Sequence, residues 1–246
     1  MVAGPAAAQA IAMARRMPSL CVGLHLVLVE GRPVLPAAAI PDLVDSAGMF
    51  RTGMARMGVQ IFFQPRVRAQ MAAEVAAQFQ AFAATGLAMD HVNAHKHFHL
   101  HPAIARQAMA MATRYAVRSI RVPHENAAHV ARIDGTRQTM DAFVVQPWTR
   151  LLQRRLRRAG FCTPDQVFGL SWSGAFNQAR LLALAQDLPD GLTEIYTHPA
   201  TSGDFAGAAP FYQYSAEMAA LTDPLVREAL ARSGAILGGF QDFSAL

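Results

Sequence analysis

Short apolar runs alternate along the chain with longer segments in which apolar residues recur at helical spacing. The short runs predict strands, which we place at residues 20–30, 89–102, 119–123, 165–172 and 192–199. The longer segments predict helices at residues 5–16, 67–85, 103–116, 140–159, 177–186, 216–221 and 224–232. Three prolines interrupt residues 31–50, so we expect a long loop there.

The order of these elements predicts the fold class. Strands separated by helices are typical of βαβ units and a parallel sheet. We therefore expect an α/β fold: a single barrel-like (β/α) domain over residues 1–246 that resembles a distorted TIM barrel, in preference to an open doubly wound sheet. Enzymes of that architecture place their chemistry where strands end and loops begin, so functional residues are expected at the carboxyl ends of the strands.

Five of the nine histidines lie within residues 91–101, all at odd positions, as does Asn93. These histidines are His91, His95, His97, His99 and His101. Alternate residues of a strand share one face, so a strand ended by Pro102 would present a row of imidazoles. Imidazole is a common metal ligand, and a buried imidazole needs a partner. The spacing predicts a metal or catalytic site that uses one or two of these rings, with the others in supporting, substrate-binding or packing roles.

Other candidate residues lie at the ends of neighbouring strands. His25, within GLHL, is either a core histidine or a second metal ligand from an adjacent strand. His198 precedes Pro199 at a strand end, where it is either structural or a general acid or base. Arg121 and Glu125 also follow a strand and could bind polar groups of a substrate.

Composition and charge exclude several classes of protein. With 52% hydrophobic and 16% charged residues, the chain is too apolar for a disordered protein, and its two cysteines cannot form a disulfide framework. Lys96 is the only lysine, and the net charge of +5 comes from arginines. The densest arginine cluster, at 150–158, lacks interleaved aromatic residues, which argues against nucleic-acid binding. It is either a solvated helix face or a contact for anionic lipid or phosphate.

No apolar run reaches the length of about 18 residues that a transmembrane helix needs. The first residues place their arginines after the apolar run, which is the reverse of a signal peptide. We therefore expect a cytoplasmic protein.

Four motifs occur in an order that resembles a known family: GLHLVLVEGRPVLP, DHVNAHKHFHLHP, IRVPHE and TEIYTHPA. They resemble the YdjC/ChbG-like carbohydrate deacetylases. The EGRPVLP loop and the IPDLVDSAGMF segment resemble in particular the subgroup associated with hopanoid biosynthesis (HpnK-like). The resemblance implies a barrel-like α/β fold and a divalent-metal-dependent hydrolase that removes N-acetyl groups from amino sugars. For the subgroup it implies an N-acetylglucosaminyl hopanoid as substrate, and hence peripheral contact with the inner membrane.

The resemblance also implies roles for individual residues. The metal-binding histidines of the family fall on His25 and His95, and the acid that protonates the leaving amine falls on His198. His97 and His99 would line the site. Asn93 stands where the family has an aspartate. Two imidazole ligands would hold Mg²⁺ weakly and favour Zn²⁺.

Family members begin with a strand that ends in an A-D-D-F-G type motif, which supplies a metal-binding aspartate and a base. That motif is absent from these residues, and Met1 falls inside the family pattern. We therefore expect a domain without its first strand and an impaired deacetylase, unless Asp90, Glu194 or another carboxylate substitutes.

Two other functions remain open from the residues alone. His-x-His on a barrel strand also suits another metal-dependent hydrolase, such as an amidohydrolase or a phosphoesterase. A chain without the base could instead bind the head group of a sugar lipid without turnover. The oligomeric state is left open.

Overall fold

The computed structural model describes residues 1–136, 140–205 and 207–244, without the side chains of residues 140–145. The chain divides into two compact units. The first unit comprises Met1–Arg121, Leu152–Thr163 and Gly238–Leu246. The second comprises Val122–Leu151 and Pro164–Leu237. That the whole chain is one deacetylase domain stays a prediction.

Two parallel strands lie at the centre of the first unit. β1 (Leu24–Leu26) pairs with β2 (Val92–Ala94), so that His25 lies opposite Asn93. Single parallel bridges continue this pairing from Val92 to Ile120 and from Ser119 to Cys162. The strand predicted at 119–123 is therefore present only as isolated bridges.

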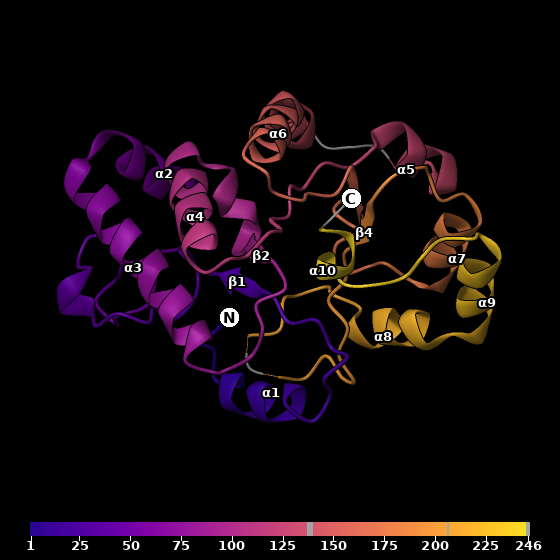
Figure 1. The fold of residues 1–246 in the computed structure, drawn as a ribbon, viewed down its shortest axis with the longest axis horizontal. Helices are drawn as coiled ribbons and strands as arrows, with labels where there is room; N and C mark the ends of the chain where they lie inside the picture. The colour runs from indigo at the N-terminus through magenta and orange to yellow at the C-terminus, as the bar shows by residue number, and fades with distance from the viewer. Residues whose placement is uncertain (137–139, 206, 245–246) are drawn as a thin grey trace. The chain divides into compact units, whose positions relative to one another are not determined.

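Helices pack against these strands (Figure 1). The described helices of the first unit are α1 (Ala7–Ala14), the 3₁₀ turn η1 (Ala37–Ala39), α2 (Met54–Phe63), α3 (Pro65–Ala83), the 3₁₀ segment η2 (His95–Leu100), α4 (Pro102–Arg114) and α10 (Phe240–Phe243). α3 contacts α2, α4 and β1. Its apolar positions Met71, Val75, Phe79 and Phe82 are buried, as their helical spacing predicts.

The same helix holds the loop that follows β1 through three buried polar side chains one turn apart, Gln70, Glu74 and Gln78. Gln78 bonds the backbone N–H and C=O of Val27 at 3.0 and 2.6 Å. Glu74 accepts hydrogen bonds from the N–H groups of Val34 and Leu35. Because a side chain satisfies the backbone of Val27, this position does not pair with another strand, and β1 is much shorter than the predicted 20–30.

The predicted strand at 89–102 is wrong beyond Ala94. Lys96 and His97 adopt left-handed backbone angles, with φ of 50° and 54°, and the chain winds into η2. The histidines after Asn93 consequently do not share one strand face, because the twofold alternation ends at residue 94.

The second unit has its own pair of strands and its own core. β3 (Gln166–Phe168) pairs in parallel with β4 (Thr193–Ile195). Its described helices are α5 (Ala127–Asp134), α7 (Gln178–Gln186), α8 (Tyr214–Thr222) and α9 (Pro224–Arg232). Phe168, Trp172 and Phe176 are fully buried in a cluster with residues of these helices. α6 (Met140–Arg158) begins in the residues of the second unit and ends in those of the first.

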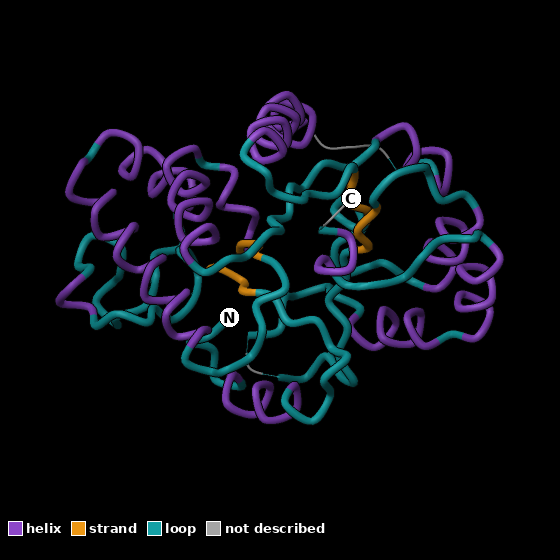
Figure 2. The backbone as a smooth tube through the Cα atoms, viewed as in Figure 1, coloured by secondary structure: helices purple, strands orange, loops and turns teal. Residues whose placement is uncertain are grey.

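The α/β class is confirmed, but the predicted barrel is not seen. Among the described residues, the strands form two separate two-stranded sheets, and helices take up far more of the backbone than strands do (Figure 2). The predicted helices agree with α1, α3, α4, α6, α7, α8 and α9 to within a few residues, whereas α2 and α5 lacked a clear sequence signal. No helix in the described part of the chain combines the length and apolar character needed to cross a bilayer.

Candidate functional site

The pairing of β1 with β2 brings two candidate histidines of the first unit together. His25 donates a hydrogen bond from Nδ1 to Oδ1 of Asn93, its neighbour across the strands, at 2.5 Å. The ring of His95, at the start of η2, meets the ring of His25 edge to face, with centroids 5.8 Å apart. The two imidazoles predicted as metal ligands are therefore neighbours.

Both imidazoles are held in the neutral form. Burial lowers the pKa of His25 to about 3, although the hydrogen bond with Asn93 acts in the opposite direction. Burial and the nearby Lys96 ammonium lower the pKa of His95. A histidine must be neutral to coordinate a metal, so both rings are in the binding form at neutral pH.

This pair fits a metal ion by its donor chemistry. Asn93 occupies Nδ1 of His25, so the lone pair of that ring is on Nε2, which is the arrangement of metal-binding histidines whose other nitrogen is hydrogen-bonded. Over the described residues, no group of three His, Cys, Asp or Glu side chains has the geometry of a metal site. The pair thus supplies two ligands, and water or substrate would complete the coordination.

The remaining histidines of the run have other partners. His99 is buried and donates from Nε2 to the carbonyl of Arg121 at 2.7 Å, and burial lowers its pKa to about 4. Its ring centroid lies 6.5 Å from that of His97. His101 accepts the Ala103 N–H at the start of α4 and bonds the carbonyl of Gly58. His101 therefore caps a helix.

His198, in the second unit, has a well-defined setting after β4. Its Nε2 lies 2.7 Å from the hydroxyl of Tyr196, and its ring centroid lies 5.0 Å from that of Tyr212. Its backbone N–H donates to the buried carboxylate of Glu217, which also accepts the N–H of Phe176. Hydrogen bonds therefore fix both the main chain of His198 and one nitrogen of its ring, and a proton-transfer group needs such a fixed position.

Two candidates from the end of a predicted strand are buried. The carboxylate of Glu125 accepts the N–H groups of Gly169, Leu170 and Ser171 and the Ser171 hydroxyl. It therefore anchors the loop after β3 in the second unit. Arg121, in the first unit, is 8% exposed, and its carbonyl is the partner of His99. Their predicted contacts with substrate stay predictions.

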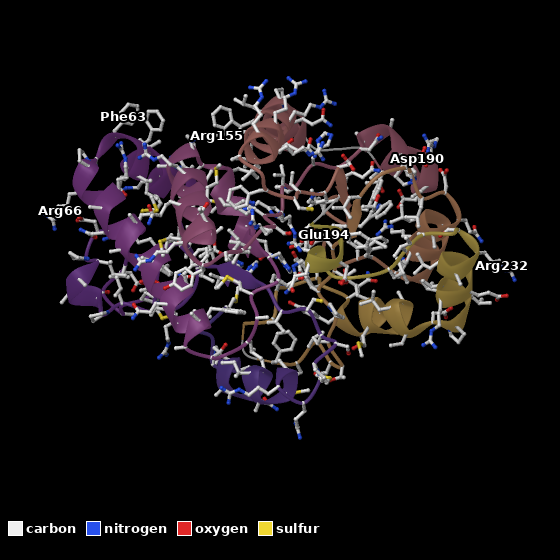
Figure 3. All side chains as sticks on the ribbon, in the orientation of Figure 1. Phe63, Arg66, Arg155, Asp190, Glu194 and Arg232 are labelled. Carbon is white, nitrogen blue, oxygen red and sulfur yellow. The ribbon has the colours of Figure 1, made fainter. Side chains whose placement is uncertain are left out.

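Glu194 lies within β4, opposite Val167 of β3 (Figure 3). Asp90, the other carboxylate proposed as a substitute base, is bound to His91 and to the backbone of α10. Sequence reasoning missed the contributions of Tyr196 and Glu217, because Glu217 lies outside the motifs quoted from the sequence and Tyr196, within TEIYTHPA, was not singled out. Tyr196 at position i−2 from His198 was the one available signal.

Comparison with known proteins gives consistent matches along the chain. A family model described as YdjC-like protein matches residues 1–232. A carbohydrate deacetylase of Geobacillus stearothermophilus is 29% identical, over 98% of this chain and 84% of that protein. The mouse carbohydrate deacetylase is 28% identical, over 100% of this chain and 84% of its own length.

A solved structure shows the same fold. The crystal structure of an Enterococcus faecalis protein, described as a candidate for cellobiose-phosphate cleavage, superposes with a TM-score of 0.70. It covers 99% of this chain and 85% of that one, at 23% identity.

Proposed function

The chain belongs to the YdjC-like protein family, and from this membership we propose that it is a carbohydrate deacetylase, a hydrolase that removes the acetyl group from an N-acetylated amino sugar. The observation that supports the proposal most directly is the neutral pair of His25 and His95, with Nδ1 of His25 held by Asn93. In this pair, Asn93 binds Nδ1 of His25 and leaves Nε2 as the nitrogen that could bind a metal ion.

The reaction is the hydrolysis of an amide. A water oxygen forms a bond to the acetyl carbon, the carbon–nitrogen bond breaks, and a proton goes to the departing nitrogen, which leaves acetate and the free amino sugar. When bound, a divalent metal, Zn²⁺ or Mg²⁺, supplies polarisation of the carbonyl and a more acidic water. His25 and His95 would hold it, and imidazole ligands favour Zn²⁺.

We assign His198 as the group that gives a proton to the departing nitrogen. The Tyr196 hydroxyl at 2.7 Å fixes its ring, and Glu217 fixes its backbone. An imidazole whose ring is fixed in this way suits the role of a general acid. His97, His99, Arg121 and Glu125 are proposed as supporting or substrate-contacting groups.

The finer substrate proposal is an N-acetylglucosaminyl hopanoid. It rests on the EGRPVLP and IPDLVDSAGMF motifs. A lipid substrate calls for contact with the inner membrane from the cytoplasm. The exposed arginines at the end of α6, which include Arg155 (Figure 3), are suited to anionic head groups.

The test is acetate release from N-acetylglucosaminyl hopanoid and from N,N′-diacetylchitobiose, with and without chelator. We expect chelator, His25→Ala and His95→Ala each to abolish release, and His198→Gln to lower kcat by about 100-fold or more. His101→Asn is the matched control, because asparagine can still cap α4, and it should keep activity.

Other outcomes would replace this proposal. Chelator-sensitive release of phosphate from phosphoesters, without acetate release, would favour another metal-dependent hydrolase. Saturable binding of the glycolipid without any product would favour a sugar-lipid-binding protein. Turnover of the chitobiose alone would retain the deacetylase and remove the hopanoid.

A further inference from the structure

A chain of side-chain hydrogen bonds runs from Asp90 to His25 within the first unit. Oδ2 of Asp90 lies 2.7 Å from Nδ1 of His91. Nε2 of His91 lies 3.2 Å from Nδ2 of Asn93, and Oδ1 of Asn93 lies 2.5 Å from Nδ1 of His25. Four side chains from β1, β2 and the residues just before β2 are thus connected in series.

The chemistry of the groups sets the direction of this chain. An ionised carboxylate only accepts hydrogen bonds, so Asp90 requires a proton on Nδ1 of His91. In a neutral imidazole the other nitrogen, Nε2, is then an acceptor, and Asn93 must turn its NH₂ group toward it. The amide oxygen of Asn93 is left for His25, whose Nδ1 must carry the proton.

Asp90 and His91 are themselves firmly held. Asp90 is 2% exposed and accepts the backbone N–H groups of Phe240 and Gln241 at 3.2 and 2.9 Å, at the start of α10. The ring of Phe240 packs on that of His91, with centroids 4.5 Å apart. Gly23 approaches His91 so closely that a Cβ there would lie 2.5 Å from the imidazole. The ring plane of His91 is therefore restricted.

We infer that Asp90, His91 and Asn93 are positioning residues that set the tautomer of His25 and thereby leave Nε2 as its metal-binding nitrogen. The inference deepens the proposed function, since it rests on His25 as a metal ligand. It assigns a purpose to Asp90, which lies away from the His25–His95 pair. It also means that the amide of Asn93 orients the His25 ring, a role that a carboxylate fills at many metal-binding histidines.

The tautomer is measured in the metal-free protein by nitrogen-15 NMR of the histidine rings, which separates protonated from unprotonated ring nitrogens. The wild type should show His25 as a single Nδ1–H tautomer. Asn93→Leu removes both amide contacts and should produce a mixture with Nε2–H. Asp90→Asn should also produce a mixture, although His91 and Asn93 lie between residue 90 and His25. The amide of an asparagine at position 90 can donate a hydrogen bond to His91, so Nδ1 of His91 no longer has to carry the proton.

Two further variants serve as controls. Asn93→Asp retains an acceptor for the Nδ1 proton and should keep the His25 tautomer. Asp45 also accepts two backbone N–H groups, those of Ala47 and Met49, but has no connection to His25. Asp45→Asn should leave the His25 tautomer unchanged. If Asn93→Leu does not fold, Asp90→Asn decides the question.

Zn²⁺ affinity, measured by competition with a chromophoric chelator, gives the second readout. We expect Asn93→Leu to bind Zn²⁺ about 10-fold more weakly than the wild type, and Asn93→Asp and Asp45→Asn to remain within about 3-fold. An unchanged His25 tautomer in both Asn93→Leu and Asp90→Asn would overturn the inference. A change in Asn93→Leu alone would overturn the roles of Asp90 and His91.

The two proposals fail separately. Suppose that the wild type binds no Zn²⁺, while Asn93→Leu and Asp90→Asn both change the His25 tautomer as expected. His25 would then not be a metal ligand, and the metal-dependent deacetylase mechanism would be wrong. The positioning role of Asp90, His91 and Asn93 would be retained, because the His25 tautomer is measured in the metal-free protein.

Discussion

Four histidines within eleven residues of one another have four different partners. His91 bonds Asp90, His95 meets the ring of His25, His99 bonds the Arg121 carbonyl, and His101 caps α4. A ring nitrogen that is fully hydrogen-bonded to protein is unavailable to a ligand. The bonding partner of each histidine, and not its position in the sequence, therefore distinguishes His95 as a candidate ligand from His101 as a structural residue.

The burial of His99 predicts how stability depends on pH. Its pKa is about 4 in the folded chain and about 6.5 in the unfolded chain, so between these values only the unfolded state binds the proton. The free energy of unfolding should therefore fall as pH decreases from about 6.5 to about 4, with His99 contributing about 1.4 kcal/mol per pH unit.

The measurement is urea denaturation at several pH values, for the wild type and for His99→Gln. Glutamine can still donate to the Arg121 carbonyl but does not titrate. We expect the free energy of unfolding of the variant to depend less steeply on pH, by the equivalent of one bound proton. His25 still contributes to this dependence with the same sign. Identical slopes in the two proteins would show that His99 is not buried as a neutral imidazole.

At the scale of elements, the two helix ends at α4 and α6 share one geometry with different residues. After α4, Ala116 donates to Thr113 O and Val117 to Ala112 O. After α6, Gly160 donates to Arg157 O and Phe161 to Leu156 O. Both are Schellman motifs, in which the first residue beyond the helix cap, here Ala116 or Gly160, adopts a left-handed backbone conformation. Ala116 has φ of +56° and Gly160 φ of +81°, so alanine carries strain that glycine avoids.

Ala116→Gly should therefore raise the free energy of unfolding by about 0.5–1 kcal/mol, because relief of the left-handed strain exceeds the added entropy of the unfolded chain. Gly160→Ala should lower it by about 1 kcal/mol. Chemical denaturation of both variants checks the pair. A loss of stability in Ala116→Gly would contradict the left-handed geometry at the end of α4.

At the scale of the whole molecule, the ligand site proposed for His25 and His95 links metal binding to folding. A ligand that binds only the folded chain stabilises it by about 2.7 kcal/mol at a free concentration 100 times its dissociation constant. Zn²⁺ at that concentration should raise the thermal midpoint of the wild type, and chelator should reverse the rise.

His25→Ala and His95→Ala should each lose most of this shift, while His101→Asn should keep it. Calorimetry or circular dichroism with matched ionic strength provides the measurement. A Zn²⁺ shift of full size in both alanine variants would place the metal elsewhere in the chain.

The sequence by itself determined most helices, the α/β class and the identity of the candidate ligands. Apolar residues at helical spacing report burial on one face, so α3 and α4 follow from local pattern. The motifs around His25, His95 and His198 are likewise local, which is why these residues could be named without a structure.

Only the tertiary structure decided where strands end and which polar groups meet. β1 stops because Gln78, 51 residues away, satisfies Val27. In the part of the chain that the structure describes, the barrel expected from the order of the elements is not seen, since its strands are reduced to short pairs. His25 meets Asn93 across 68 residues, and Asp90 meets Gln241 across 151. A hydrogen bond between distant residues leaves no periodic trace in a sequence, because its energy depends on a geometry that the whole fold creates.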